Sequence, residues 1–342
     1  MRNKIINKKS DSNKPGFTII ELVVVIAVMG ILSSIAFVSY NGWKQSTTIA
    51  QLKSDLNGVA AAMENARTFN NTYPATIPST FTASSGVTLT GGSLNGGKGY
   101  CVDAVNGTLS YNITNMYDTP SAGVCPILYL DAGNTASYPG TGTAWTDLSG
   151  SGNNGVTRNS AGVPTQYTFD GSNGGALTFD GNSYVKVNST PALNFSSNGS
   201  FTISVWIKPN TVASAWIRGI MVQESYLSNG YRLGIANGGQ PKFWTTQSGG
   251  TLDLGSSQNL TTTQWANIVV TYNNQQAYMY FNGVQTGSST GTYIAGSNHV
   301  YIGLTVSEYY SGLLSSVSIY GRSVAPSEVQ QNFNEQRVRY GI

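Results

Sequence analysis

Residues 266–287 read ANIVVTYNNQQAYMYFNGVQTG. Apolar and polar side chains alternate along this stretch, and two turn-forming pairs, Asn273-Asn274 and Asn282-Gly283, interrupt the alternation. A period of two is the pattern of a β-strand with one buried face, and such pairs are typical of tight hairpin turns. The stretch therefore predicts half-buried antiparallel strands joined by short turns.

Similar runs with Gly and Asn turns between them occur on both sides of this stretch: ALTFDGNSYVKV, SFTISVWIKP, GYRLGIAN, VYIGLT and GLLSSVSIYGR. They fill about 215 residues from Ile127 onward. A two-sheet jelly roll is the economical architecture for so many short strands. The chain of 342 residues contains 40 glycines, 20 tyrosines and only 10% charged residues, a composition typical of extracellular β-rich proteins.

Several segments of this region resemble laminin-G-like (concanavalin A-like) jelly rolls. They are Leu130-Asp131-Ala132-Gly133-Asn134, the WTDLSG at 145–150, the LTFDG at 177–181, the FTISVWI at 201–207, Trp265 followed by VVTY, and the closing strand at 312–320. The resemblance implies a binding domain for glycans, proteins or other surfaces, often near a calcium ion.

Calcium requires several oxygen ligands, usually with carboxylates among them, and Asp131 and Asp180 are the candidates. Related sequences often carry acids just before the last strand, where this chain has Ser315 and Ser316, and this departure argues against calcium. The alternative for Asp180 is a turn-forming role in a Phe-Asp-Gly hairpin.

Aromatic side chains on loops are candidates for stacking on sugar rings. The candidates are Trp216, Trp244, Tyr309 and Tyr310, and core packing is the alternative for each. For Trp206 and Trp265, which fall within expected strands, we predict core packing. For the Tyr309-Tyr310 pair we predict exposure.

An enzymatic function is not expected. Glycosidases require two carboxylates at a set separation, and Glu224 and Glu308 stand apart from other acids in the sequence. His299 is the only histidine, so a catalytic triad or a zinc site lacks parts. Nucleic acid is not an expected partner either, because the region from residue 127 contains nine acidic and nine basic residues.

The N-terminal region contains KPGFTIIELVVVIAVMGILSSIAF from Lys14, which is largely apolar from Phe17 to Val38 and has Glu21 as its one charged residue there. A run of about 22 apolar residues suits a membrane-spanning helix, and the preceding lysines place the N-terminus inside the cell. An ordinary single-pass anchor with a stray acid is one interpretation.

The motif around Gly16 and Phe17 also resembles the class III signal of type IV prepilins. The resemblance implies cleavage after Gly16 and N-methylation of Phe17 by a prepilin peptidase/methylase. The new ammonium group then lies one helical turn from Glu21. We expect the Glu21 carboxylate to pair with the terminal ammonium group of a neighbouring pilin subunit, because either charge alone is unfavourable in an apolar filament core.

Periodic apolar residues continue beyond the membrane run and predict one long helix from Phe17 to about Phe69. Residues 71–126 hold short strands that suit a small pilin head. Two cysteines in so long a chain, Cys101 and Cys125, fit one disulfide formed outside the cytosol, although two free thiols are the alternative.

The sequence thus predicts four segments: a cleaved leader at 1–16, a transmembrane and assembly helix at 17–70, a disulfide-bonded head at 71–126 and a jelly-roll binding domain at 127–342. The expected function is a minor, tip-located pilin that adheres to extracellular glycans or surface proteins, residing in the cytoplasmic membrane before assembly and at the cell surface afterwards. A type II secretion pseudopilin and a membrane-tethered lectin are the alternatives.

Overall fold

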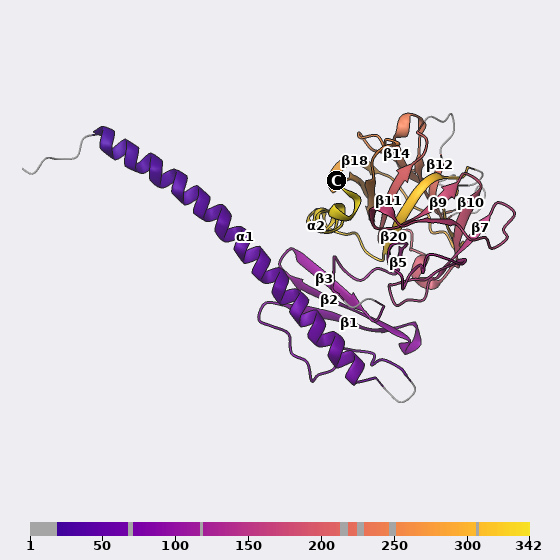
Figure 1. Cartoon of the computed structure of the whole chain (residues 1–342), viewed down its shortest axis with the longest axis horizontal. Coiled ribbons are helices and arrows are strands. Elements are labelled where there is room, and N and C mark those ends of the chain that lie inside the picture. Colours follow the sequence, from indigo (N-terminus) through magenta and orange to yellow (C-terminus); the bar gives the residue numbers. More distant parts are fainter. Residues whose placement is uncertain are drawn as a thin grey trace, which may run out of the picture. The chain divides into compact units, whose positions relative to one another are not determined.

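The computed structural model describes residues 19–67, 71–116, 119–212, 218–223, 229–245, 251–305 and 308–342, without the side chains of residues 35–39 and 41. The chain forms two compact units, residues 1–50 and 51–342. Helix α1, Ile19–Asn65, contributes its first part to the first unit and its last turns to the second. Figure 1 colours α1 indigo, and the elements that follow run from purple to yellow along the chain.

In the first unit, the large apolar side chains of α1 from Ile19 to Leu32 are exposed, with exposed fractions of 42–82%. Among the described residues, no helix combines the length and apolarity that crossing a membrane requires. The membrane-spanning segment expected from the sequence stays a prediction.

In the second unit, α1 buries one face. Leu52, Leu56, Val59 and Met63 are completely buried, and their spacing places them on one side of a helix. The helix ends at Asn65, four residues before the expected end at Phe69; residues 68–70 lie outside the described part of the chain.

The head is a four-stranded antiparallel sheet with strand order β1-β2-β3-β4. Its strands are β1 (Thr88–Leu94), β2 (Gly99–Asn106), β3 (Leu109–Thr114) and β4 (Ser121–Ala122), with a 3-10 turn at Asn95–Gly97 between β1 and β2. Tyr100, Val102, Ala104, Tyr111 and Ile113 of β2 and β3 are buried. The head therefore forms a small core that also requires the buried face of α1.

Two antiparallel sheets form the sandwich, which confirms the predicted jelly roll. We call one the back sheet, with order β18-β17-β16-β11-β20-β9-β8 and β5 paired to β20. Its strands are β5 (Leu128–Asp131), β8 (Thr168–Asp170), β9 (Ala176–Asp180), β11 (Ser200–Pro209), β16 (Ala266–Asn273), β17 (Gln276–Phe281), β18 (Val284–Thr290) and β20 (Ser311–Tyr320).

We call the other the front sheet, with order β15-β14-β13-β12-β19-β10-β7-β6. Its strands are β6 (Ala144–Trp145), β7 (Gly155–Asn159), β10 (Ser183–Val187), β12 (Arg218–Val222), β13 (Tyr231–Ile235), β14 (Pro241–Thr245), β15 (Asp253–Gly255) and β19 (Val300–Ile302). Short 3-10 turns lie at Ser172–Gly174, Pro191–Leu193 and Asn237–Gly239.

The hairpin β16-β17 differs from the prediction by one residue. Its turn residues with positive φ are Asn274 and Gln275, not Asn273-Asn274. The register explains the shift, because Tyr272 pairs with Ala277 and both side chains are completely buried in the core between the sheets. The second expected turn, Asn282-Gly283, is confirmed, with φ of 51° and 78°.

Alternation along the strands fills the core between the sheets. On β11, Phe201 and the three other inward-facing side chains are completely buried. The Phe201 ring contacts Phe195, Tyr231, Tyr272 and Tyr293, with ring centroids 4.6–5.6 Å apart. An aromatic cluster of this size supplies much of the apolar burial that stabilises the sandwich.

The C-terminal segment covers the outer face of the back sheet. It consists of helix α2, Pro326–Gln336, and a 3-10 turn, Arg337–Tyr340. Trp206 stacks on Tyr340 at 3.9 Å and on Phe333 at 5.8 Å between ring centroids. The predicted burial of Trp206 and Trp265 is confirmed, but both pack beneath this segment and outside the core between the sheets.

Candidate functional site

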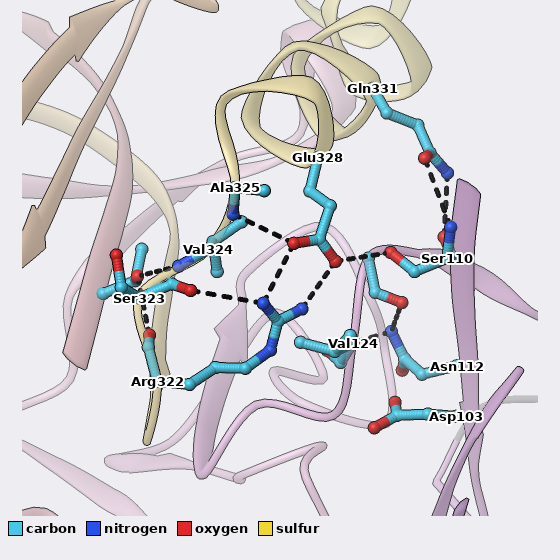
Figure 2. A network of polar contacts seen from close by, with 12 residues as sticks. Asp103, Ser110, Asn112, Val124, Arg322, Ser323, Val324, Ala325, Glu328 and Gln331 are labelled. Carbon is cyan, nitrogen blue, oxygen red and sulfur yellow. Dashed lines mark hydrogen bonds and ion pairs between the residues drawn. The ribbon is translucent and has the colours of Figure 1, made fainter. Parts of the chain in front are cut away.

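A polar joint connects the head to the sandwich through α2 (Figure 2), and Glu328 lies at its centre. Arg322 donates to the two Glu328 carboxylate oxygens at 2.9 and 2.5 Å, Ser110 Oγ of β3 donates at 2.8 Å, and the Ala325 N–H donates at 3.0 Å. Burial alone would raise the pKa of Glu328, but the Arg322 guanidinium and the other donors hold it below its usual value. Glu328 is therefore a charged anchor at neutral pH.

Two further residues of α2 extend this joint. Gln331 Nε2 donates to the Ser110 carbonyl at 2.8 Å, and the Tyr111 hydroxyl donates to Glu335 at 2.5 Å. Three successive turns of one helix thus contact β3 of the head. The sequence analysis identified the helix after Pro326 but none of these contacts.

Asp103 of β2 lies next to the joint. It lines a cleft of about 540 Å³ together with Arg322 and Glu328, and its carboxylate accepts the Cys125 N–H at 2.6 Å. Burial raises the pKa of Asp103 to about 7, although the Cys125 N–H and Arg322 act in the opposite direction. The predicted disulfide between Cys101 and Cys125 is confirmed and holds this N–H beside the carboxylate.

The front sheet presents its outer face differently from the back sheet. Along β10 and β14 the inward side chains are buried and the outward ones are half-buried, whereas outward side chains of the back sheet such as Trp206, Val269 and Thr202 are at most 5% exposed. The difference arises because α2 and the turn after it cover the back sheet. The front sheet is thus the candidate binding face.

One row of side chains crosses this face in direct register, and we call it the front row. It consists of Val156, Lys186, Tyr301, Val222, Arg232, Trp244 and Asp253. At the usual spacing between strands the row is about 30 Å long. The Arg232 guanidinium lies 5.9 Å from the Trp244 ring centroid, and Lys242 pairs with Asp253 at 3.0 Å.

Further aromatic side chains adjoin the front row. The Tyr184 ring lies 5.7 Å from Tyr301 and 6.4 Å from Tyr309, measured between ring centroids. His299 Nδ1 accepts the Ser189 N–H at 3.0 Å, and burial and the nearby Lys186 lower the His299 pKa. His299 therefore adds no charge to this face at neutral pH.

The predicted ligand residues have different outcomes. Trp244 and Tyr309 are half-buried at this face, and their role stays a prediction. Tyr310 is completely buried, so its predicted exposure is wrong: its ring packs on Phe179 and its hydroxyl donates to the Leu313 carbonyl at 3.0 Å. Trp216 lies outside the described residues.

The two calcium candidates do not come together. Asp180 pairs with Ser311 at one end of β20 and Asp131 with Ser316, five residues along the strand, which is roughly 17 Å. Arg339 donates two hydrogen bonds to the Asp131 carboxylate, at 2.7 and 2.5 Å. Asp180 caps its own turn by accepting the Asn182 N–H at 2.9 Å, as the alternative interpretation expected. The two carboxylates therefore do not ligate a common ion.

Of the predicted processing and assembly residues, the structure describes only Glu21. Glu21 lies in the first turn of α1, where a carboxylate is favoured by the helix dipole, and its side chain is exposed. Gly16 and Phe17 lie outside the described residues. The processing site and the assembly role of Glu21 stay predictions.

Comparisons with known proteins match two separate parts of the chain. Residues 11–37 match the family model of the prokaryotic N-terminal methylation motif, and residues 179–330 match that of the concanavalin A-like lectin/glucanases superfamily. Type II secretion system core protein G of Pectobacterium carotovorum subsp. carotovorum is 31% identical over 68 residues, 20% of this chain and 44% of that protein. The chain thus spans less than half the length of this curated relative.

Three similar solved structures are distant from this chain in sequence. Domain 4 of an extracellular arabinanase from Geobacillus stearothermophilus, in complex with arabinotriose, is 18% identical with a TM-score of 0.47 and covers 60% of this chain and 97% of that one. The binding domain of paraclostridial mosquitocidal protein 1 is 19% identical with a TM-score of 0.49, and the match covers 61% of this chain and 52% of that one. The binding domain of botulinum neurotoxin DC, in complex with rat synaptotagmin II, is 16% identical with a TM-score of 0.48. That match covers 62% of this chain and 52% of the neurotoxin chain.

The chain therefore combines a prokaryotic N-terminal methylation motif with a concanavalin A-like jelly roll. It resembles a type IV prepilin fused to a laminin-G-like domain. Its N-terminal part is thus pilin-like or pseudopilin-like, and its C-terminal part has a lectin-like fold.

Proposed function

We propose that the protein is a minor subunit of a type IV pilus, located at the tip or at low density along the fibre, and that its sandwich adheres to extracellular glycans or surface proteins. The observation that carries the proposal is the exposed apolar surface of α1 within the methylation motif. Such a surface requires either lipid or neighbouring helices as partners. Before assembly the helix would reside in the cytoplasmic membrane, and a prepilin peptidase would cleave after Gly16 and expose the amine of Phe17.

The added bulk of the sandwich favours a minor subunit. From Ile127 onward, about 215 residues follow the head. A repeating shaft made only of this chain would have to accommodate one sandwich per subunit. A low-copy or terminal position avoids this crowding.

A type II secretion pseudopilin is the second candidate, because the curated relative is a core protein of that system. There, the sandwich would engage secreted cargo. Immunogold labelling separates the two: label on surface fibres supports the pilus, and label confined to the cell envelope supports the secretion system. A membrane-tethered lectin would also give envelope label, but without N-methylated Phe17.

The Glu21 carboxylate provides a direct test of assembly. We expect Glu21→Ala to be cleaved and methylated normally but to be at least about tenfold depleted from sheared pili, because the neighbour's terminal ammonium loses its partner. Quantitative immunoblotting of sheared and cellular fractions measures the ratio. Glu21→Asp, which keeps the charge, is the control and should retain most incorporation. Wild-type levels of Glu21→Ala in pili would contradict the proposal.

A further inference from the structure

Charge is distributed unevenly over the sandwich. From Ile127 onward the chain contains nine acidic and nine basic residues, so the sequence shows no net charge there. Four of the bases, Arg158, Lys186, Arg232 and Lys242, lie on the outer face of the front sheet. Asp253 at the end of the front row is paired with Lys242, and Glu308 on the neighbouring loop adds one further acid. Among the described residues of this face, bases therefore outnumber acids.

Two acidic residues on the opposite side are each paired with a base. Asp131 pairs with Arg339, and Glu328 pairs with Arg322 and Ser110 at the joint. These carboxylates are buried in contacts that hold the C-terminal segment in place. Since these two acids are already paired, the bases on the front sheet favour a negatively charged partner there.

Aromatic rings alternate with the bases on this face. Tyr301 stands between Lys186 and Arg232 along the front row, with Val222 in between, and Trp244 follows Arg232. Tyr184 and Tyr309 adjoin Tyr301 from the side. Flat apolar ring faces suit the apolar faces of pyranose rings, and the guanidinium and ammonium groups suit carboxylate or sulfate groups.

We infer that the outer face of the front sheet binds an acidic polysaccharide, laid along the front row across the strands. The inference rests on the proposed adhesive function and specifies its ligand class. The row of about 30 Å accommodates several consecutive sugar rings, which is why a polymer fits better than a single sugar. An acidic peptide would use the charges but not the ordered aromatic faces.

The test uses the full-length protein in detergent and beads that bear dextran sulfate, unmodified dextran or polyglutamate. We expect binding to dextran sulfate and not to dextran, and weakening with added salt. Lys186→Gln and Arg232→Gln should each lower the affinity for dextran sulfate about fivefold, because each removes one charge-assisted contact. Lys208→Gln is the matched control on the back sheet and should have no effect.

Trp244→Leu distinguishes sugar stacking from charge alone. We expect it to weaken binding to dextran sulfate about tenfold, because stacking of a sugar ring on the indole is lost, while leaving any binding to polyglutamate unchanged. Circular dichroism spectra identical to those of the wild type establish that each variant is folded. Equal effects of Lys208→Gln and Arg232→Gln, or equal affinity for polyglutamate and dextran sulfate, would overturn the inference.

Failure of the inference and of the proposed function are separable. If sheared pili contain the protein but the purified protein does not retain dextran sulfate, the acidic ligand is wrong and the pilus assignment stands. If surface fibres lack the protein, the pilus assignment is wrong whatever the beads retain.

Discussion

At the scale of single residues, two carboxylates at the joint have pKa values shifted in opposite directions. Glu328 receives a guanidinium, a hydroxyl and a backbone N–H, and its pKa falls, whereas Asp103 is buried with less compensation and its pKa rises to about 7. The same helix-to-head contact therefore contains one permanent anion and one group that titrates near neutral pH.

Asp103 gives a pH dependence with a defined sign. Its folded pKa of about 7 lies above the unfolded value of 3.8, so its stabilising contribution is complete below pH 4 and is lost as the pH rises through 7. We expect the wild type to lose about 2 kcal/mol of unfolding free energy from this group between pH 5 and pH 8. Asp103→Asn, which still accepts the Cys125 N–H, should lack this loss.

Urea denaturation of both proteins at pH 5 and pH 8 measures the effect. Glu328 acts in the opposite direction at low pH, since its lowered pKa means that stability is lost on acidification. Comparison above pH 5 keeps the two groups apart. A pH dependence that is the same in Asp103→Asn and in the wild type would contradict the assignment.

At the scale of elements, the head sheet is short and depends on its neighbours. Four strands, the longest of eight residues, bury few large side chains, and the sheet relies on α1, α2 and the disulfide. A disulfide therefore contributes a larger share of the stability of this small sheet than it would of the sandwich.

Removal of the disulfide by Cys101→Ala with Cys125→Ala should lower the unfolding free energy by about 3 kcal/mol, because the unfolded chain regains the entropy of a loop with a sequence separation of 24 residues. Denaturation of the wild type in reductant provides the parallel measurement. The alanine variant and the reduced wild type should agree. Wild-type stability in both conditions would mean that the bridge adds nothing to the head.

At the scale of the whole molecule, residues 51–342 form one compact unit because α2 is shared between the head and the sandwich. Glu328→Ala removes the centre of the joint and leaves Arg322 and Ser110 without their partner. We expect a loss of about 2 kcal/mol, since a partly buried ion pair is broken on one side. Asp253→Ala, which breaks the exposed ion pair with Lys242 outside the joint, is the control and should cost less.

We expect Glu328→Ala to let the head open locally without unfolding of the sandwich. Hydrogen exchange followed by mass spectrometry should show faster exchange in β2 and β3 while β11 and β16 remain protected. Equal acceleration in the head and in the sandwich would show that the joint does not couple them.

Much of the fold was predictable, because alternation in 266–287 and in 200–209 directly encodes buried strand faces. The hairpin turn at Asn274-Gln275 was displaced by one residue because the buried pair Tyr272 and Ala277 decides the register. The prediction for Tyr310 was wrong because Tyr309 and Tyr310, adjacent residues just before β20, have different environments: Tyr309 is half-buried and Tyr310 is completely buried.

The candidate site was less predictable than the fold. Trp244 and Tyr309 were identified by residue type, but Tyr184, Tyr301 and Arg232 become neighbours only through cross-strand pairing, which no local pattern states. The Arg339–Asp131 pair joins residues 208 positions apart and removed one calcium candidate. The Ala325-x-x-Glu328 spacing was the one local signal that pointed to the joint, since an acid three residues into a helix can cap its start.

The pairing of Arg339 with Asp131 has a practical consequence. Arg339 lies three residues before Ile342, and Asp131 ends β5, the first strand of the sandwich, so the last residues return to the place where the chain enters that domain. A fluorescent protein or affinity tag fused after Ile342 would therefore be attached beside the entry strand of the back sheet and away from the front row. Such a fusion is suited to imaging adherent cells without obstructing the proposed contact face.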